Sequence, residues 1–376
     1  MLFVHDHKFY VCGDEVYTAG SLTDALFKRY EDVFGEVSVL ANRCDLSEKK
    51  DMPRLSPDRK MHLYPKRNIL GIGKAKRIRE LVKNEKYIVL RLPSINGILV
   101  GLASLFRKKD YMVELVGCPK DALSNHGLTG KLVMPFVTFF TKVLVKRASH
   151  VLYVTDVFLQ SRYPTKGKAI GCSDVLLDEE YIASSPKSSK QKDQTLILGT
   201  AGALDVRYKG QEYVIAAIPK LNEQGIRVEY KLAGSGTGNY LRETADQLGC
   251  KDQVKICGLL DCTAIKEFYS SLDVYIQPSL TEGMPRAVIE AMSSGCYCIG
   301  TNVGGIPELV GESSCFEKAN VKDIVCKISQ YYDVKADDNR LHCLSRSRDF
   351  IESILKGKRE KFYNEFKSYV DSLTGK

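Results

Sequence analysis

Residues 279–310 read SLTEGMPRAVIEAMSSGCYCIGTNVGGIPELV, and this stretch predicts a loop, a helix and a following strand. It comes after a strand-like run at 273–277, DVYIQ, which predicts another strand. Gly283 and Pro285 indicate a loop before a helix of about residues 285–294, because proline suits the first helical position, where its missing N–H costs nothing. Alternation of strand and helix is typical of a parallel α/β sheet.

Two carboxylates, Glu282 and Glu290, flank the predicted start of this helix. Unpaired N–H groups and the positive end of the helix dipole make such a start a site for an anion such as phosphate. Gly283 has no side chain, so the backbone can come close to a ligand. A nucleotide-diphosphate sugar carries hydroxyls on both sides of its phosphates, and it is therefore the ligand that this layout favours.

The same stretch resembles the donor-site signature of the retaining glycosyltransferases of family 4, which have the GT-B fold. The matching elements, in order, are Pro278-Ser279, Glu282-Gly283-Met284-Pro285, Glu290-Ala291-Met292, Gly295 and Gly304-Gly305-Ile306-Pro307-Glu308. An ordered set of this kind is more specific than a lone glycine motif. The resemblance implies an α/β protein of two Rossmann-like domains whose parallel sheets face a central cleft. A plain strand–turn–helix unit with solvated carboxylates is the alternative.

Length and composition agree with two soluble domains. A chain of 376 residues, 44% hydrophobic and 27% charged, can bury two cores of ordinary size. We expect an N-terminal, acceptor-side domain at 1–182, a polar linker at 183–193 and a donor-binding domain at 194–357. In GT-B enzymes the last helices cross back onto the first domain, so the resemblance implies the same for a C-terminal helix at about 358–376.

The sequence indicates a cytoplasmic location. The first residues, MLFVHDHKFY, lack the basic start and apolar core of a signal peptide. Residues 132–145, LVMPFVTFFTKVLV, are too short to span a bilayer, and we expect a core helix of the first domain there rather than a membrane wedge. Twelve scattered cysteines without a Cys-x-x-Cys pair favour buried free thiols over a metal site.

The positive charge is concentrated in the first half of the chain. Residues 1–180 hold 29 Lys and Arg against 21 Asp and Glu, whereas the remainder holds 26 against 25. This favours an anionic partner: an acidic membrane surface, a pyrophosphate-bearing acceptor or nucleic acid. A basic run from Lys66 to Lys86 predicts an amphipathic helix that is either solvated or bound to anionic lipid at the inner face of the plasma membrane. Few aromatic residues interrupt it, so we do not expect nucleic acid as the partner.

In the predicted first domain, the resemblance selects Gly20, Ser21 and His126. The loop before the first helix touches the donor phosphates or the acceptor in the family, and Gly20 and Ser21 occupy that position. A helix cap is the alternative role for Ser21. A histidine of the family points toward the donor sugar from the region where this chain has His126. That match rests on position and context alone.

The predicted second domain opens with a strand, a glycine loop and a basic pair at 195–210. Gly202 permits close approach, and Lys209 at the mouth of the loop can neutralise phosphate charge. The family has an arginine where this chain has Ala203, so either Arg207 replaces that charge or Lys209 holds the diphosphate alone. The residues that the resemblance places near the nucleotide and its base are Gly234, Gly258 and Leu259.

The predicted reaction is metal-independent transfer of a hexosyl or N-acetylhexosaminyl group from a nucleotide-diphosphate sugar, and the resemblance implies that the anomeric configuration is retained. A UDP-sugar is favoured over a GDP-sugar, and no cofactor is expected. No Asp-x-Asp pair is present to hold a divalent ion. Charge on the departing diphosphate would be met by Lys209, Arg207 and the helix start at Gly283-Met284-Pro285. The resemblance implies that Glu282 orients sugar hydroxyls and that Glu290 holds the ribose. Glu282, His126 and Lys209 are the predicted catalytic residues.

The acceptor is predicted only by class. Residues 5–10 and 158–164 look like those of enzymes that assemble capsule, exopolysaccharide or O-antigen in bacteria, which implies a lipid-linked or saccharide acceptor. Two other functions stay open at this point. One is a nucleotide-sugar epimerase of the same architecture, which needs no acceptor. The other is a basic module that binds membranes or nucleic acid without catalysis.

Overall fold

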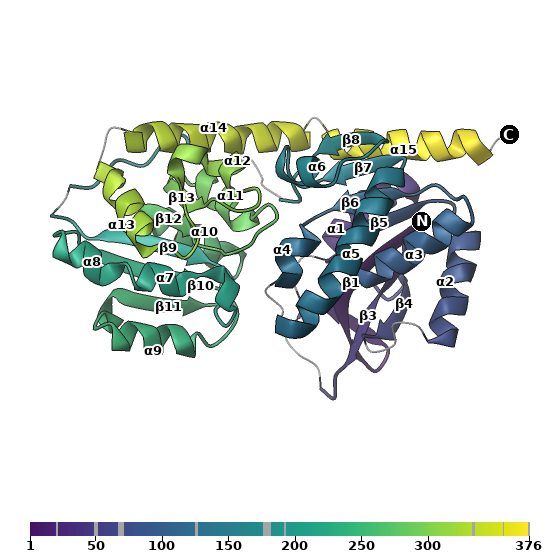
Figure 1. Ribbon diagram of the computed structural model, residues 1–376, viewed down its shortest axis with the longest axis horizontal. Helices are drawn as coiled ribbons and strands as arrows, with labels where there is room; N and C mark the ends of the chain where they lie inside the picture. Colours follow the sequence, from purple (N-terminus) through teal and green to yellow (C-terminus); the bar gives the residue numbers. More distant parts are fainter. Residues whose placement is uncertain are drawn as a thin grey trace. The chain divides into compact units, whose positions relative to one another are not determined.

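A computed structural model describes residues 1–19, 22–48, 52–66, 71–124, 127–175, 182–191, 193–332, 335–355 and 357–374 (Figure 1). The chain divides into two compact units. Met1–Cys172 and Gly357–Lys376 form the first, and Ser173–Lys356 forms the second. Each unit has its own parallel sheet with helices on both faces (Figure 1).

The first unit is built on a sheet in the order β4-β3-β1-β5-β6-β7-β8, with β2 paired to β1. Only the β1–β2 pair is antiparallel among the described pairs of this sheet. The strands are β1 (Leu2–Cys12), β2 (Glu15–Thr18), β3 (Ser38–Asp45), β4 (Lys60–Pro65), β5 (Ile88–Leu92), β6 (Met112–Leu115), β7 (His150–Tyr153) and β8 (Lys168–Gly171). The helices are α1 (Asp24–Phe34), α2 (Ile72–Asn84), α3 (Ile95–Phe106), α4 (Pro119–Ser124), α5 (Gly127–Arg147), α6 (Phe158–Arg162) and α15 (Lys358–Thr374).

The last helix, α15, belongs to the core of the first unit. Its Phe362, Phe366 and Val370 are buried in the same cluster as Phe3 and Phe34. These residues recur at helical spacing, so one face of α15 is apolar and needs a surface to cover it. The chain therefore returns, after completing the second unit, to close the core with which it began.

A buried carboxylate ties α15 to the sheet. Glu114 on β6 is fully buried and accepts hydrogen bonds from Tyr30 of α1, at 2.8 Å, and from Tyr363 of α15. Arg91 on β5 forms an ion pair with it at 3.0 Å, and Arg359 lies 3.6 Å away. Burial and the nearby carboxylate raise the pKa of Tyr30 well above its usual value, so this phenol stays protonated and donates. One negative charge thus holds together groups from four elements.

The expectation of a core helix at 132–145 is confirmed for one face of the helix only, the face that carries the buried Val137, Thr141, Leu144 and Val145. This segment lies in α5, which meets the length and composition of a membrane-crossing helix, but only 28% of its most apolar window is buried. Leu132 and Phe136 are 74% and 67% exposed. The apolar composition predicted burial. However, α5 has more apolar side chains than can fit on the one face that packs against α3 and α4, so the others are exposed.

The basic helix predicted between Lys66 and Lys86 is α2 in its described part. Its apolar residues Ile78, Leu81 and Val82 are buried in the first unit. Among its described side chains, the helix therefore exposes charge but not the large apolar groups that insertion into a lipid surface requires.

The second unit has a sheet in the order β11-β10-β9-β12-β13-β14, with every described pair parallel. The strands are β9 (Leu196–Ala201), β10 (Val228–Ala233), β11 (Val254–Gly258), β12 (Val274–Gln277), β13 (Tyr297–Thr301) and β14 (Cys315–Phe316). The helices are α7 (Gln211–Ile215), α8 (Ile218–Glu223), α9 (Asn239–Gln247), α10 (Cys262–Ser271), α11 (Arg286–Ser293), α12 (Ile306–Val310), α13 (Val321–Ser329) and α14 (Lys335–Leu355).

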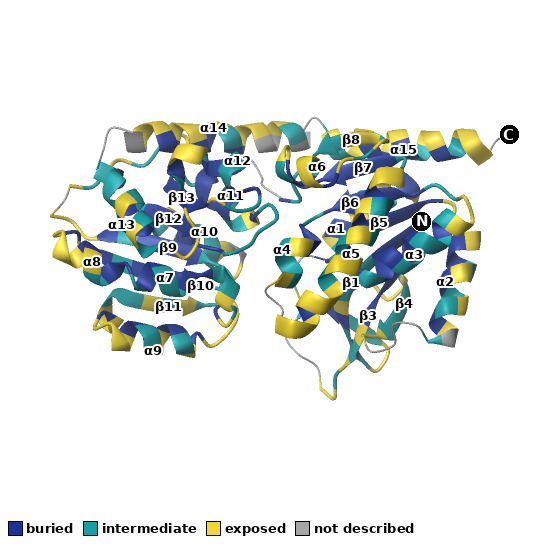
Figure 2. Ribbon diagram, in the orientation of Figure 1, coloured by how far each residue is buried: buried dark blue, intermediate teal, exposed yellow. Residues whose placement is uncertain are grey.

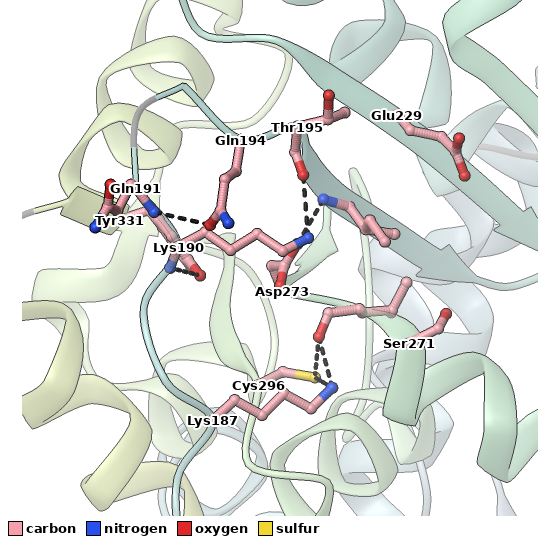
Figure 3. A network of polar contacts seen from close by, with 12 residues as sticks. Lys187, Lys190, Gln191, Gln194, Thr195, Glu229, Ser271, Asp273, Cys296 and Tyr331 are labelled. Carbon is pink, nitrogen blue, oxygen red and sulfur yellow. Dashed lines mark hydrogen bonds and ion pairs between the residues drawn. The ribbon is translucent and has the colours of Figure 1, made fainter.

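The segment 183–193 is not a free linker, because it is anchored to the second unit by two lysines (Figure 3). The ammonium of Lys187 donates to the carbonyl oxygens of Ser270, at 2.7 Å, and Leu272, at 2.6 Å. Lys190 forms an ion pair with Asp273 at 2.6 Å. The polar composition that suggested a flexible connection instead supplies these contacts, and the first unit ends at Cys172 rather than at 182.

Replacing Glu114 with alanine is expected to destabilise the first unit by about 3–5 kcal/mol, because Arg91 would keep its buried charge without the partner carboxylate. Asp32→Ala is the matched control, since it also breaks an ion pair, with Lys28, but one whose side chains are 57% and 73% exposed. That variant should lose less than about 1 kcal/mol. Urea denaturation of both variants provides the comparison, and equal losses would contradict the assignment.

Candidate functional site

The candidate site lies at the carboxyl ends of β9 and β12, which are neighbours at the centre of the second sheet. From β9 the chain proceeds outward to β10 and β11, and it then returns to β12 on the other side of β9 before continuing to β13. Loops that leave a parallel sheet at such a reversal of strand order diverge and leave room for a ligand. Lys209 follows β9, and Glu282 follows β12.

Lys209 and Glu282, predicted as parts of one site, are in direct contact. The Lys209 ammonium lies 2.7 Å from Glu282 Oε1. Their side chains are 22% and 12% exposed, so the pair is shielded but still reaches solvent. Lys209 ends the short 3-10 turn Arg207–Lys209, and the loop of Glu282 leads into α11.

Two further polar side chains hold the Glu282 carboxylate in place. Ser279 Oγ donates to Glu282 Oε1 at 2.7 Å, and Gln277 Nε2 donates to the same oxygen at 3.1 Å. Tyr275 in turn donates from its hydroxyl to Gln277 Oε1 at 2.7 Å. Because Oε1 takes all three hydrogen bonds to this carboxylate among the described residues, Glu282 Oε2 is left for a ligand.

Sequence reasoning did not identify Gln277 as part of the site. It sits on β12, which is otherwise apolar, and it is 1% exposed. A buried polar residue costs stability unless it is hydrogen-bonded, so a lone glutamine at the end of an apolar strand was the available signal. Its two hydrogen bonds at the site, to Ser279 and Glu282, explain why it is tolerated there.

The two loops approach each other so closely that only glycine fits between them. Gly210 has a φ of 72°, and a Cβ built there would lie 2.1 Å from the carbonyl oxygen of Pro278. Beside it, Leu280 N–H donates to Tyr208 O at 2.8 Å. The backbone itself thus joins the loop of Lys209 to the loop of Glu282.

The glycines of the Gly-Gly-x-x-Glu segment support the Glu282 loop from its other side. At Gly304, with a φ of 61°, a Cβ would lie 2.3 Å from the carbonyl oxygen of Glu282. Gly305 N–H donates to Gly283 O at 2.7 Å. The motif therefore acts through backbone packing around Glu282 and Gly283.

Three other predicted residues meet where β9, β10 and β11 end. Gly234 has a φ of 151°, and a Cβ there would lie 1.9 Å from the carbonyl oxygen of Gly202. Gly234 N–H donates to Gly258 O at 2.7 Å. The next residue, Leu259, is 79% exposed. These glycines join the strand ends, and Leu259 offers an apolar surface beside them.

The side chain of Arg207 contacts residues other than Lys209 and Glu282. Its guanidinium forms an ion pair with Glu212 at 2.8 Å and lies 4.1 Å from the centroid of the Tyr240 ring. The side chain is 69% exposed. Of the two cations predicted for the diphosphate, Lys209 is therefore the one in contact with Glu282.

Glu290 lies inside α11, and its orientation is set by a tyrosine. Tyr269 on α10 donates from its hydroxyl to Glu290 Oε2 at 2.7 Å. Burial and the nearby charges raise the pKa of Tyr269 well above its usual value, so it remains a donor. The helix begins at Arg286, with Pro285 as the capping residue rather than the first helical residue, and Met284 packs against the apolar core beneath it.

Gly20, Ser21 and His126 lie outside the described residues. Across the described ranges, no group of three or more His, Cys, Asp or Glu side chains is placed to hold a metal ion. The described part of the candidate site therefore consists of residues of the second unit.

Comparison with a solved structure defines the class of the fold. The chain aligns with HepE of Anabaena in complex with UDP over 100% of its own length and 99% of that chain, with a TM-score of 0.65 and 15% sequence identity. A likeness at this identity concerns the fold alone. Two units with parallel sheets and this likeness define the GT-B fold.

Comparison with known sequences defines the family. The chain is 30% identical to protein CapJ of Staphylococcus aureus, over 99% of this chain and 97% of CapJ. It is 31% identical to the putative colanic acid biosynthesis glycosyltransferase WcaL of Salmonella typhimurium, over 42% of this chain and 38% of WcaL. Residues 195–333 match the family described as glycosyl transferases group 1. The chain belongs to this family and is a glycosyltransferase.

The predictions of a GT-B fold and of a glycosyltransferase are thereby confirmed. The matched range 195–333 contains Lys209, Glu282 and Glu290. The described candidate site therefore lies within the range that matches this family.

Gly210→Ala is expected to destabilise the second unit by about 1–3 kcal/mol more than Gly225→Ala, because only the first Cβ meets backbone. Gly225 is the matched control: its φ of 74° imposes a similar left-handed strain, but a Cβ there has nothing within 4 Å. Urea denaturation measures the difference. Equal behaviour of the two variants would rule out the close approach.

Proposed function

We propose that the protein catalyses retaining, metal-independent transfer of a hexosyl or N-acetylhexosaminyl group from a nucleotide-diphosphate sugar. The acceptor is a lipid-linked or saccharide molecule in the synthesis of a bacterial surface polysaccharide. The single observation that carries the donor site is the Lys209–Glu282 pair, at 2.7 Å, where the strand order of the second sheet reverses.

Similar proteins support the choice of substrates. HepE was crystallised with UDP and, in a further structure, with UDP-glucose, which favours a UDP-sugar here. WcaL is named as a putative colanic acid biosynthesis glycosyltransferase, which supports a polysaccharide product. A GDP-sugar is the second candidate donor.

Lys209 serves as the cation for the diphosphate in the proposed reaction. The charge of Lys209 is balanced by Glu282 at 2.7 Å, and a diphosphate brings a larger negative charge to the same ammonium. The anomeric carbon–oxygen bond to the diphosphate breaks, and negative charge grows on the departing phosphate. Stabilising such developing charge usually accelerates a reaction more than any other single effect of the enzyme. The N–H groups at the start of α11 add to this stabilisation.

The two glutamates orient the donor. Glu282 Oε2 accepts hydrogen bonds from sugar hydroxyls, and Glu290 holds the ribose. The acceptor hydroxyl attacks from the side of the leaving group, its oxygen bonds to the anomeric carbon, and its proton passes to the departing phosphate. The anomeric configuration is therefore retained. His126 is the proposed contact to the donor sugar from the first unit.

The acceptor suggests where the enzyme works. A lipid-linked acceptor lies in a membrane, and the first half of the chain carries the excess of positive charge. We therefore place the enzyme in the cytoplasm, bound peripherally to the inner, anionic face of the plasma membrane.

Glu290→Ala is expected to weaken binding of UDP at least about tenfold, because a hydrogen bond to a charged group is lost. Calorimetric titration with UDP measures this. Glu243→Ala, at an exposed position of α9, is the matched control and should bind as the parent chain does. Unchanged affinity in Glu290→Ala would count heavily against the donor site, and a panel of nucleotide sugars in the same assay identifies the base and the sugar.

Transfer is expected to proceed at an undiminished rate in excess EDTA, because Lys209 and the start of α11 supply the charge that a metal would otherwise provide. Lys209→Ala should lower kcat about 100-fold or more. Lys220→Ala, which removes a lysine from α8 in the same unit, is the control. Loss of activity with EDTA and its recovery with Mg²⁺ would refute metal independence.

A further inference from the structure

Helix α5 carries a stripe of exposed apolar side chains that the donor site does not use. Leu128, Leu132, Phe136 and Phe139 are 81%, 74%, 67% and 61% exposed. Their spacing of four, four and three residues places them on one face of the helix. Figure 2 shows exposed turns along α5 beside buried ones. A continuous apolar stripe on the surface of a soluble protein usually marks a binding surface.

The same face continues into a cluster of cations. Counting on by four and three residues from Phe139 leads to Val143 and Lys146, and α5 contains no acidic residue. At this end is a cavity of about 910 Å³, in which the one carboxylate is Asp110. Its cationic lining residues are Lys108, Lys109, Lys146, Arg147 and Lys166.

The opposite face of α5 fixes the helix to the first unit. Val137, Thr141, Leu144 and Val145 are each 5% exposed or less. Crossing a bilayer would require α5 to withdraw these side chains and empty part of the core. The helix is long and apolar enough to cross a membrane by length and composition, but its packing favours lying along a membrane surface.

We propose that this face of α5 docks the first unit on an anionic lipid bilayer. The apolar stripe enters the boundary between headgroups and acyl chains, and the cations at the carboxyl end of α5 bind lipid phosphates. The proposal rests on the proposed function, because it supplies the contact with the membrane that holds a lipid-linked acceptor. It assigns to α5 the role that the charge pattern alone had suggested for α2.

The cations at one end of this α5 face favour a bilayer over a second copy of this chain as the binding partner. In a symmetric dimer the same patch meets itself. A parallel pairing of two α5 helices would bring cations against cations, and an antiparallel pairing would bury cations against the apolar half of the partner. Both are costly without a counter-charge. An anionic bilayer offers an apolar layer next to a phosphate layer, so it satisfies both halves of the face.

The test is sedimentation of the full chain with vesicles of phosphatidylglycerol and phosphatidylcholine. Binding is expected to fall with added salt and to be much weaker on phosphatidylcholine alone. Leu132→Ser with Phe136→Ser should weaken partitioning by about tenfold for each side chain removed. Lys146→Ala with Arg147→Ala should weaken it about fivefold for each charge. Lys76→Ala with Lys83→Ala, on the exposed side of α2, is the matched control and should lose less.

Three results would overturn the proposal. They are no binding by the parent chain, equal loss in the α2 control, and a dimer in sedimentation velocity that the α5 variants abolish. UDP titration of the same variants separates this proposal from the donor site. The α5 variants are expected to keep their UDP affinity and to lose vesicle binding. If the parent chain did not bind UDP, the proposed function would be refuted, and membrane docking would be judged on the vesicle result alone. Because the substituted side chains are exposed, thermal denaturation should show parent-like stability.

Discussion

The candidate site depends on the close approach of the Gly210 backbone to Pro278 O, because that approach brings two distant loops together. Lys209 is next to Gly210, and Glu282 is four residues after Pro278, so any separation of the loops would part the ion pair. Ser279 and Gln277 then fix the carboxylate that the lysine meets. The close approach of two backbones thus decides where the charges lie, and the chemistry of the site follows from that geometry.

The sequence predicts the meeting of these two loops well because its signals are local. Lys209 with Gly210, and Glu282 with the glycines that follow it, are short patterns whose spacing specifies backbone conformation, and the structure brings them together as expected. The parallel sheets followed in the same way from alternating strands and helices. Family resemblance added the pairing of the two loops, which no local pattern contains.

The sequence could not predict which way individual side chains point or which partners they contact, because both depend on the packed fold. Arg207, one of the two cations considered for the diphosphate, contacts Glu212 and the ring of Tyr240 rather than Glu282, and its role at the diphosphate stays a prediction. The composition of 132–145 shows that the helix is apolar, but it does not determine which face of α5 is buried. Lys187 looked like part of a flexible linker, yet backbone carbonyls at the end of α10 hold it. Gly20, Ser21 and His126 lie outside the described residues.

The return of α15 to the first unit has a consequence for the order in which the protein is made. Phe362, Tyr363 and Phe366 fill the core around Phe34, and the Glu114 network is complete only when Tyr363 is present. A ribosome finishes the whole of Ser173–Lys356 before it adds these residues. The second unit therefore has its full sequence before the first unit does, and the apolar side chains that α15 covers can be buried by that helix only after translation has reached the end of the chain.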